Sequence, residues 1–459
     1  MMNKDRKESL RKSLSRSEAI SPEAGVDLNE FEKAVTIRVY KRRWLVLILF
    51  IMFVFGNKLQ WLQYTMILNV IVKYFNVSSM AVKATAMIYS ASFVVFLYPV
   101  TWLIHKRGLR FVCVIASASV CLGTWIKYFA IAPDQFSLIL IGQCFVGAWQ
   151  VVCSSLPATL AAVWFGPNEV ATAMALAGSG TVIGVAVSSI VSPIIVRNHG
   201  EPGDIGKNLN HYILPIAFYC TCVLFLMLFF FSEGPKLPPS KARALQKLCL
   251  GEDLEFFKKI RRLLKNRNYI FLWNAHGLVG GAMICVNVSL NTLYMRHFEH
   301  GEKDTGRMGL LIILSGYCGA VIFCRLVDRY KIFKLILVIL YAANILTTIL
   351  FGIAMYFEVQ WTVYVAIGLY GFFTHGYFTT AYETCAELTY PEPVTISVTI
   401  LNLANQLYSA IFVACLDQIL ISYSDVAAYA FLTLVSIIGF ILTCVTRDER
   451  KRQHAGKLG

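Results

Sequence analysis

Charged residues are scarce in this chain. Only 15% of its 459 residues are Asp, Glu, Lys or Arg, whereas 57% are hydrophobic, and the mean hydropathy is +0.60. Soluble domains are typically about 25% charged and about 45–50% apolar. The composition therefore excludes an ordinary soluble enzyme and predicts an all-α protein that crosses a membrane many times.

Motifs for energy-driven or metal-dependent chemistry are missing. There is no G-x-x-x-x-G-K-[ST] phosphate loop, which argues against an ATP-driven pump. The thirteen cysteines show no C-x-x-C spacing and lie mostly in apolar segments, where they are expected to pack as small buried residues. No Ser-His-Asp or metal-ligand spacing stands out, and no signal peptide opens the chain. We therefore expect a protein that is not an enzyme and uses no metal or cofactor.

Long apolar runs dominate instead. A membrane-spanning helix needs about 20 mostly apolar residues. Twelve segments meet this requirement: 45–72, 81–104, 111–130, 136–163, 171–196, 212–232, 268–294, 307–327, 334–356, 361–386, 394–420 and 426–446. The sequence therefore predicts a tail, six spans, a polar loop, six spans and a second tail, at residues 1–43, 44–232, 233–267, 268–446 and 447–459.

Basic residues are concentrated on one side of the predicted membrane. Of the 42 Lys and Arg residues, 33 lie in five segments that share a side if the spans are correct: 1–43, 106–110, 233–267, 325–334 and 447–457. Basic loops stay in the cytoplasm, so we expect both termini there, in a multi-pass protein of the plasma membrane. The net charge of +15 then reflects topology and the lipid bilayer, and we expect no nucleic-acid partner.

Two short basic turns occupy matching places in the two halves. "TWLIHKRGLR" (101–110) follows the second span and "CRLVDRYKIFK" (324–334) follows the eighth. They resemble the loop motif G-x-x-x-D-R-x-G-R-R of the major facilitator superfamily, although His105 replaces the acid in the first copy. This resemblance implies the major facilitator fold of twelve transmembrane helices in two six-helix halves. Asp328 and Arg329 keep the motif and are expected to control gating.

Longer strings resemble one family within that superfamily. The likeness runs from Tyr40 to about Asp417, and its strings include "YKRRWLVL" (40–47), "QWLQY" (60–64), "YPVTWLIHKRGLR" (98–110), "LPATLAAVWFGPNEVATA" (156–173), "GYFTTAYETCAELTYPE" (376–392) and "LNLANQ" (401–406). They are similar to the feline leukaemia virus subgroup C receptor family. The resemblance implies transport of choline and ethanolamine down their gradients, and some members are associated with haem.

Aromatic and amide side chains in the apolar spans suggest a binding site. Trp61 and Tyr64 are three residues apart, which places them on one face of a helix. An indole ring can hold a quaternary ammonium group, which has no hydrogen to donate. Gln150 and Gln406 offer amide oxygens near the middle of their spans. The resemblance implies that Trp61, Gln150 and Gln406 line a choline pocket. The alternative is that the indole packs on lipid or a helix and the amides bond between helices.

Two residues depart from the family pattern. His276 stands where the family usually has a tyrosine, and it either flanks a ligand or bonds between helices. Lys58 stands where a small residue is usual, three positions before Trp61. A charge at membrane depth costs at least about 2.5–3.5 kcal/mol. We favour a pairing of Lys58 with an acid such as Glu383 or Asp417. The alternatives are that Lys58 selects the substrate or that it reaches lipid or the surface.

Two further residues are candidates for gating. Glu383 lies deep in the tenth span and is expected to form a gate salt bridge, and Arg307 stands at the outer start of the eighth span.

Together these features predict a monomeric facilitative uniporter, working by alternating access, for a small amine. Choline is the first candidate and ethanolamine the second. A transporter of haem or another bulky or anionic metabolite and a non-transporting receptor are the alternatives.

Overall fold

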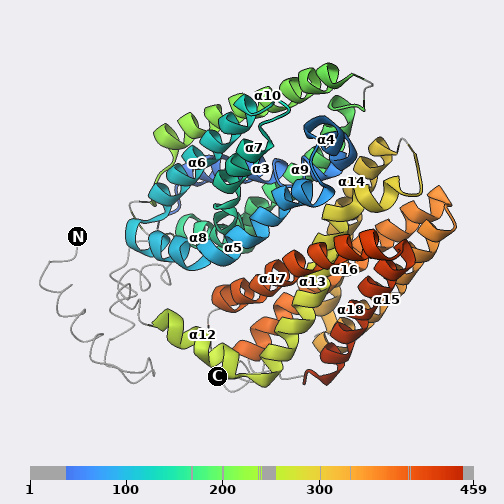
Figure 1. Cartoon of the computed structure of the whole chain (residues 1–459). Coiled ribbons are helices and arrows are strands. Elements are labelled where there is room, and N and C mark those ends of the chain that lie inside the picture. The colour runs from blue at the N-terminus through green and yellow to red at the C-terminus, as the bar shows by residue number, and fades with distance from the viewer. Residues whose placement is uncertain are drawn as a thin grey trace, which may run out of the picture.

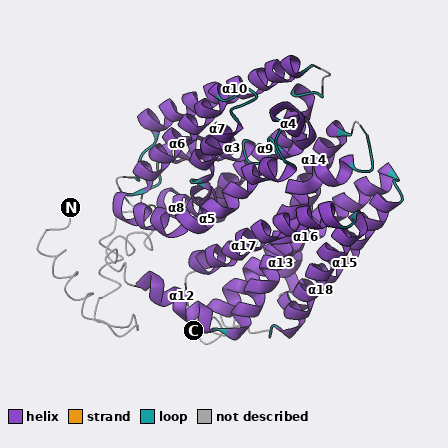
Figure 2. Ribbon diagram, viewed as in Figure 1, coloured by secondary structure: helices purple, strands orange, loops and turns teal. Residues whose placement is uncertain are grey.

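A computed structural model describes residues 38–166, 169–198, 201–235, 237, 239, 255–299, 301–330, 332–390, 392 and 394–447. These residues form helices joined by short loops and contain no strand (Figure 2). Most of both predicted tails and part of the predicted central loop lie outside them.

The helices form two groups, one from each half of the sequence (Figure 1). The N-terminal group comprises α3 (Arg42–Leu59), the short 3₁₀ helix η1 (Thr65–Ile67), α4 (Leu68–Phe75), α5 (Ser79–Arg107), α6 (Leu109–Phe129), α7 (Phe136–Gly147), α8 (Gln150–Trp164), α9 (Val170–Ile195) and α10 (Pro202–Phe230). The C-terminal group comprises α13 (Arg267–Met295), α14 (Glu302–Tyr330), α15 (Phe333–Tyr356), α16 (Gln360–Thr389), α17 (Val394–Ser422) and α18 (Asp425–Val445), and α12 (Glu255–Lys265) precedes it.

Ten of the described helical segments are long and apolar enough to cross a membrane. They correspond to ten of the twelve predicted spans, with α7 and α8 together forming one of them. The other two predicted spans correspond to α16 and to α3 with α4. The 30 residues of α16 suffice to span the bilayer, but its threonine, tyrosine and histidine residues lower its hydropathy. We refer to the face where α3 begins and α18 ends as the termini face.

The first span is not the continuous helix 45–72 that the sequence predicts. Helix α3 ends at Leu59, and helical structure resumes at Thr65. The backbone N–H groups of Gln60 and Trp61 turn back to the carbonyls of Asn57 and Lys58, 3.2 Å away in both cases. Polar side chains make this break possible, because they satisfy backbone groups that a regular helix would have paired. A broken helix at membrane depth is a common feature of transporter binding sites.

Helix α10 begins ten residues earlier than the predicted start of its span at 212. The polar stretch from Pro202 to His211 extends the helix beyond its apolar part. Proline is favoured at the first position of a helix, and Asp204 in the first turn complements the helix dipole. Hydropathy alone detects the part that lies in lipid and misses this extension.

Small residues allow the helices of the N-terminal half to pack closely. A Cβ on Gly180 or Gly184 of α9 would lie 2.7–2.8 Å from backbone oxygens of α3, so both positions need glycine. The small-xxx-small spacing of this pair predicts such packing, and the structure confirms it.

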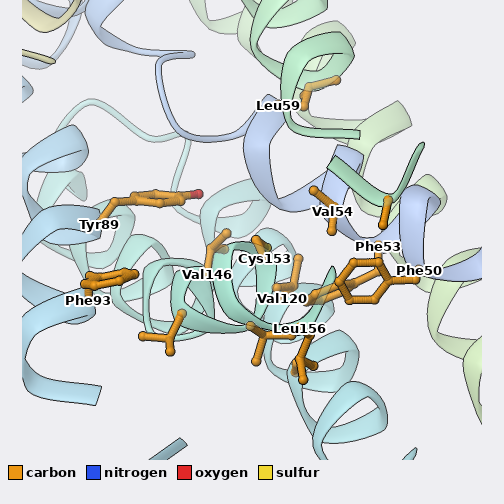
Figure 3. Close-up of a cluster of buried hydrophobic side chains, with 14 of the residues drawn as sticks. Phe50, Phe53, Val54, Leu59, Tyr89, Phe93, Val120, Val146, Cys153 and Leu156 are labelled. Carbon is orange, nitrogen blue, oxygen red and sulfur yellow. The ribbon is translucent and has the colours of Figure 1, made fainter. Parts of the chain in front are cut away.

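The larger hydrophobic core comes mainly from this half, and Figure 3 shows part of it around Phe50, Val54 and Val120. A smaller core comes mainly from the C-terminal half.

The first basic turn is held by an acid from outside the motif. Both oxygens of Glu233, which follows α10, accept hydrogen bonds at 2.7 Å from the backbone N–H groups of Leu109 and Arg110 at the start of α6. Gly108 precedes them with φ 86°, and a Cβ there would collide with the Glu233 carboxylate. Glu233 therefore provides the contact with a helix end that the motif normally obtains from its own acid.

Candidate functional site

A buried polar network fixes the break after α3. The Lys127 ammonium of α6 donates hydrogen bonds to the side-chain oxygens of Gln60 (2.5 Å) and Gln143 (2.9 Å). The Gln143 side-chain N–H donates to the backbone oxygen of Gln60 at 2.8 Å. Lys127 and both glutamines are completely buried. An ammonium held by amide oxygens satisfies groups that would otherwise be unpaired in the membrane, so this network stabilises the non-helical segment 60–64.

Trp61 lies in that segment, after the end of α3. It is half-buried and packs against both hydrophobic cores. Its indole N–H is buried and has no hydrogen-bond partner among the described residues. Tyr64 is 1% exposed within the larger core. The predicted shared helix face of Trp61 and Tyr64 is wrong, because residues 60–64 are not helical.

Lys58 lies beside the Trp61 ring. Its Nζ is 5.6 Å from the ring centroid, within the range of a cation–π contact. The side chain is buried, at 5% exposure, and its Cβ packs near Gly184. Among the described residues, no carboxylate forms an ion pair with it. The pairing that we favoured from the sequence is not observed, since Asp417 pairs with a different lysine, Lys83.

The two predicted glutamines come from opposite halves. Gln150 is the first residue of α8 and is 4% exposed, and half-buried Gln406 lies on α17. Their two helices are in contact. Both side-chain oxygens are buried and accept no hydrogen bond from the described residues. Buried amide oxygens are normally paired, so these two acceptors are unusual in having no partner among the described residues.

His276 is enclosed by protein side chains. It is fully buried on α13, and its Nε2 lies 3.1 Å from the Asn405 amide nitrogen of α17. The rings of Tyr377, Phe378 and Tyr382 on α16 surround it with centroid distances of 5.1–6.1 Å. Of the two roles considered from the sequence, this arrangement matches a histidine bonded between helices.

A buried ion pair joins the two halves on the side opposite the termini face. The Lys83 Nζ of α5 lies 2.5 Å from the Asp417 Oδ1 of α17, and the two side chains are 0% and 8% exposed. Seven residues further along α5, Ser90 accepts a hydrogen bond from Ser409 at 3.0 Å. Closer to that surface, the Asn69 side chain donates to Glu302 of α14 at 2.7 Å. These contacts hold the halves together from mid-depth to the face opposite the termini.

Lys83 is not among the residues predicted from the sequence, and Asp417, one of the two acids suggested for Lys58, pairs with Lys83 instead. The available signal was their position, because each is an ionisable residue within a predicted span. Such residues usually pair or serve transport. Pairing across the halves is not visible in the sequence, since 334 positions separate the two residues.

The predicted gating residues have different surroundings. Arg307 is exposed and pairs with Asp304 of its own helix at 2.9 Å. Asp304 in turn accepts hydrogen bonds from Gln360 and Tyr364 of α16, so these contacts join helices of one half. This arrangement does not place Arg307 in a gate between the halves.

Glu383 is half-buried on α16, and its role as a gate stays a prediction. Asp328 and Arg329 lie near the end of α14, on the termini face. The Arg329 guanidinium lies 5.7 Å from the ring of Tyr330. The side chain of Asp328 lies outside the described part of the structure, so the expected locking contact also stays a prediction.

Comparison with known proteins identifies the family. Residues 45–413 match the model of the Major Facilitator Superfamily. The choline/ethanolamine transporter FLVCR2 of Homo sapiens is 33% identical over 93% of this chain and 81% of its own length. The choline/ethanolamine transporter flvcr2a of Danio rerio is 31% identical over 95% of this chain and 93% of its own length. The chain belongs to the feline leukaemia virus subgroup C receptor family of major facilitators.

Solved structures support the same fold for this family member. The crystal structure of a bacterial homologue of the human lysosomal transporter Spinster superposes with a TM-score of 0.63. The match covers 89% of this chain and 96% of that one at 14% identity, so it shows the fold alone. The family and the ten apolar helices together show that this chain is a multi-pass membrane transporter.

Proposed function

We propose that this family member is a facilitative uniporter for a small amine, with choline as the first candidate and ethanolamine as the second. Its relatives are named choline/ethanolamine transporters, which supports this substrate class. The observation that carries the proposal is the position of Trp61, at a helix break and packed against both hydrophobic cores, of which the smaller comes mainly from the C-terminal half. A ligand on this ring would contact the surface along which the two halves move.

The chemistry around Trp61 suits a small hydroxylated amine. A cation on an aromatic face gains about 0.5–2 kcal/mol, depending on how dry the site is. The unpaired oxygens of Gln150 and Gln406 can accept hydrogen bonds from a hydroxyl or from the N–H groups of a primary ammonium. Neutral amides provide these contacts without the cost of burying a carboxylate.

The contacts between the halves support alternating access as the transport mechanism. The Lys83–Asp417 pair and the Asn69–Glu302 bond join the halves on the side opposite the termini face. A substrate entering from that side requires these contacts to break. With both termini in the cytoplasm, as the basic loops indicate, they form an extracellular gate in a monomer of the plasma membrane.

The test is uptake of labelled choline and ethanolamine into cells that express the chain. We expect saturable uptake of both, and we expect Trp61→Ala to abolish it at unchanged surface expression. Trp361→Ala is the matched control, because Trp361 is 80% exposed at the start of α16. Uptake should be normal in that variant.

The same experiment separates the alternatives. Competition of uptake by haem, with no competition by ethanolamine, would favour a transporter of bulky anionic metabolites. Normal surface expression without uptake of any of these compounds would favour a non-transporting receptor. Either result would contradict the proposed function.

A further inference from the structure

Lys58 is a buried basic residue that the transport cycle described above does not use. It lies in the last turn of α3 and is 5% exposed. No described carboxylate forms an ion pair with it, whereas the buried cation Lys83 has an acid and Lys127 has two amide oxygens. An uncompensated charge at membrane depth is costly, and a group retained at such a cost usually acts on a ligand.

The position of this lysine affects the ring on which a substrate would bind. Its Nζ is 5.6 Å from the centroid of Trp61. A quaternary ammonium on the same indole would lie close to the lysine in an environment of low dielectric, where two like charges repel strongly. Lys58 therefore weakens the binding of a ligand whose only charge is positive.

The other candidate polar groups of the site have the opposite charge preference. Lys58 attracts an anionic group, and the unpaired oxygens of Gln150 and Gln406 attract a cationic or hydrogen-donating group. Trp61 offers a surface to both the lysine and the apolar parts of a ligand. This combination suits a molecule that carries an acidic group and an ammonium group a few bonds apart.

We propose that Lys58 is a specificity-determining residue of the central site, which weakens choline and binds the acidic group of a zwitterionic amine of similar size. The proposal rests on the proposed function, because it assumes that substrates bind beside Trp61. The inference adds a difference from a simple choline carrier. This chain tolerates a carboxylate on the substrate, because Lys58 binds that group.

Choline and glycine betaine form a matched pair of probes. Both carry the same trimethylammonium group, and the hydroxymethyl group of choline is a carboxylate in betaine. The inhibition constant of each compound is measured against uptake of labelled choline, and its binding to the purified protein is measured in parallel. The ratio of the two constants is internal to each variant and does not depend on expression level.

Four variants are compared with the wild type. In Lys58→Met and Lys58→Gln, we expect choline to bind about tenfold more tightly and betaine about tenfold more weakly, which shifts the ratio about a hundredfold. Lys58→Arg keeps the charge and should keep the wild-type order of the two ligands. Lys73→Met removes an exposed lysine of α4 and should leave the ratio unchanged.

The possible outcomes distinguish this inference from the proposed function. An unchanged ratio in Lys58→Met and Lys58→Gln, or equal changes for both ligands, would overturn the inference and leave choline transport intact. Wild-type protein that betaine does not inhibit would also overturn it, even if the Lys58 variants fail to fold. Wild-type protein that recognises neither ligand would overturn the inference and the proposed function together.

Discussion

Lys83 of α5 and Asp417 of α17 form an ion pair at 2.5 Å that joins the two halves of the transporter. Both side chains are buried, so neither charge is compensated by water. Removing one partner of a buried pair typically costs about 3–5 kcal/mol, whereas replacing both by apolar residues is often tolerated. The pair as a whole should therefore contribute little to the stability of the fold. Its main effect should be to hold the two halves in this relative position.

We expect Lys83→Met and Asp417→Asn to lower the thermal stability and the uptake of choline strongly. The double variant Lys83→Met/Asp417→Leu should recover stability but shift the protein toward the state open opposite the termini face. Thermal unfolding of purified protein and labelling of cysteines introduced near Ser90 measure the two effects. Arg296→Met is the control, because its pair with Asp425 is partly exposed within one half and should contribute about 1 kcal/mol or less. A double variant as unstable as the single ones would contradict this account.

Lys127 should act on the substrate through the break after α3. Lys127→Met leaves the side-chain oxygen of Gln143 without its donor and leaves that of Gln60 with Thr124 alone, at a cost of about 1–3 kcal/mol. We expect a lower Tm and a higher KM for choline, since the segment that carries Trp61 loses its support. Lys127→Arg should recover part of both. Lys207→Met, in an exposed pair on α10, should change neither. A normal KM in a destabilised Lys127→Met protein would limit this residue to a structural role.

The two glutamines should contribute separately to substrate affinity. Gln150→Ala and Gln406→Ala each remove a polar contact worth about 0.5–1.5 kcal/mol, which corresponds to a rise in KM of about two- to tenfold. Kinetics of uptake at matched surface expression measure this change. Gln418→Ala is the matched control, because Gln418 is exposed on the same helix as Gln406. Unchanged KM values for both variants would remove these residues from the site.

Gly108 should be one of the least tolerant glycines in the chain. Its φ of 86° is unfavourable for alanine, and a Cβ would displace the Glu233 carboxylate from the start of α6. We expect Gly108→Ala to lower the Tm and reduce uptake. Gly178→Ala in α9 has open space for its Cβ and should be neutral or slightly stabilising. Equal effects of the two substitutions, measured by thermal unfolding, would contradict the role of this turn.

Hydropathy predicted most of the fold, because crossing a membrane imposes a length and a composition on each span. Basic residues and the two matching turns then indicated two similar halves. The break at residues 60–64 was missed, since it depends on Lys127 and Gln143, which are distant in sequence and whose contacts leave no local pattern.

The sequence suggested residues for the candidate site, but it did not reveal which charged residues pair with one another. Trp61, Gln150 and Gln406 were identified from polarity at membrane depth and from the family resemblance. The sequence could not show that Lys58 lacks an acidic partner among the described residues, because several acids lie in the spans and only the packing of α5 against α17 assigns Asp417 to Lys83.

The central claim is that a small amine binds on Trp61 between the two halves. A structure of the protein determined with saturating choline tests it most directly. The account predicts the ammonium within about 6 Å of the Trp61 ring centroid, with the choline hydroxyl in reach of the Gln150 or Gln406 side chain. Choline bound elsewhere, with the indole packed against protein or lipid alone, would contradict it.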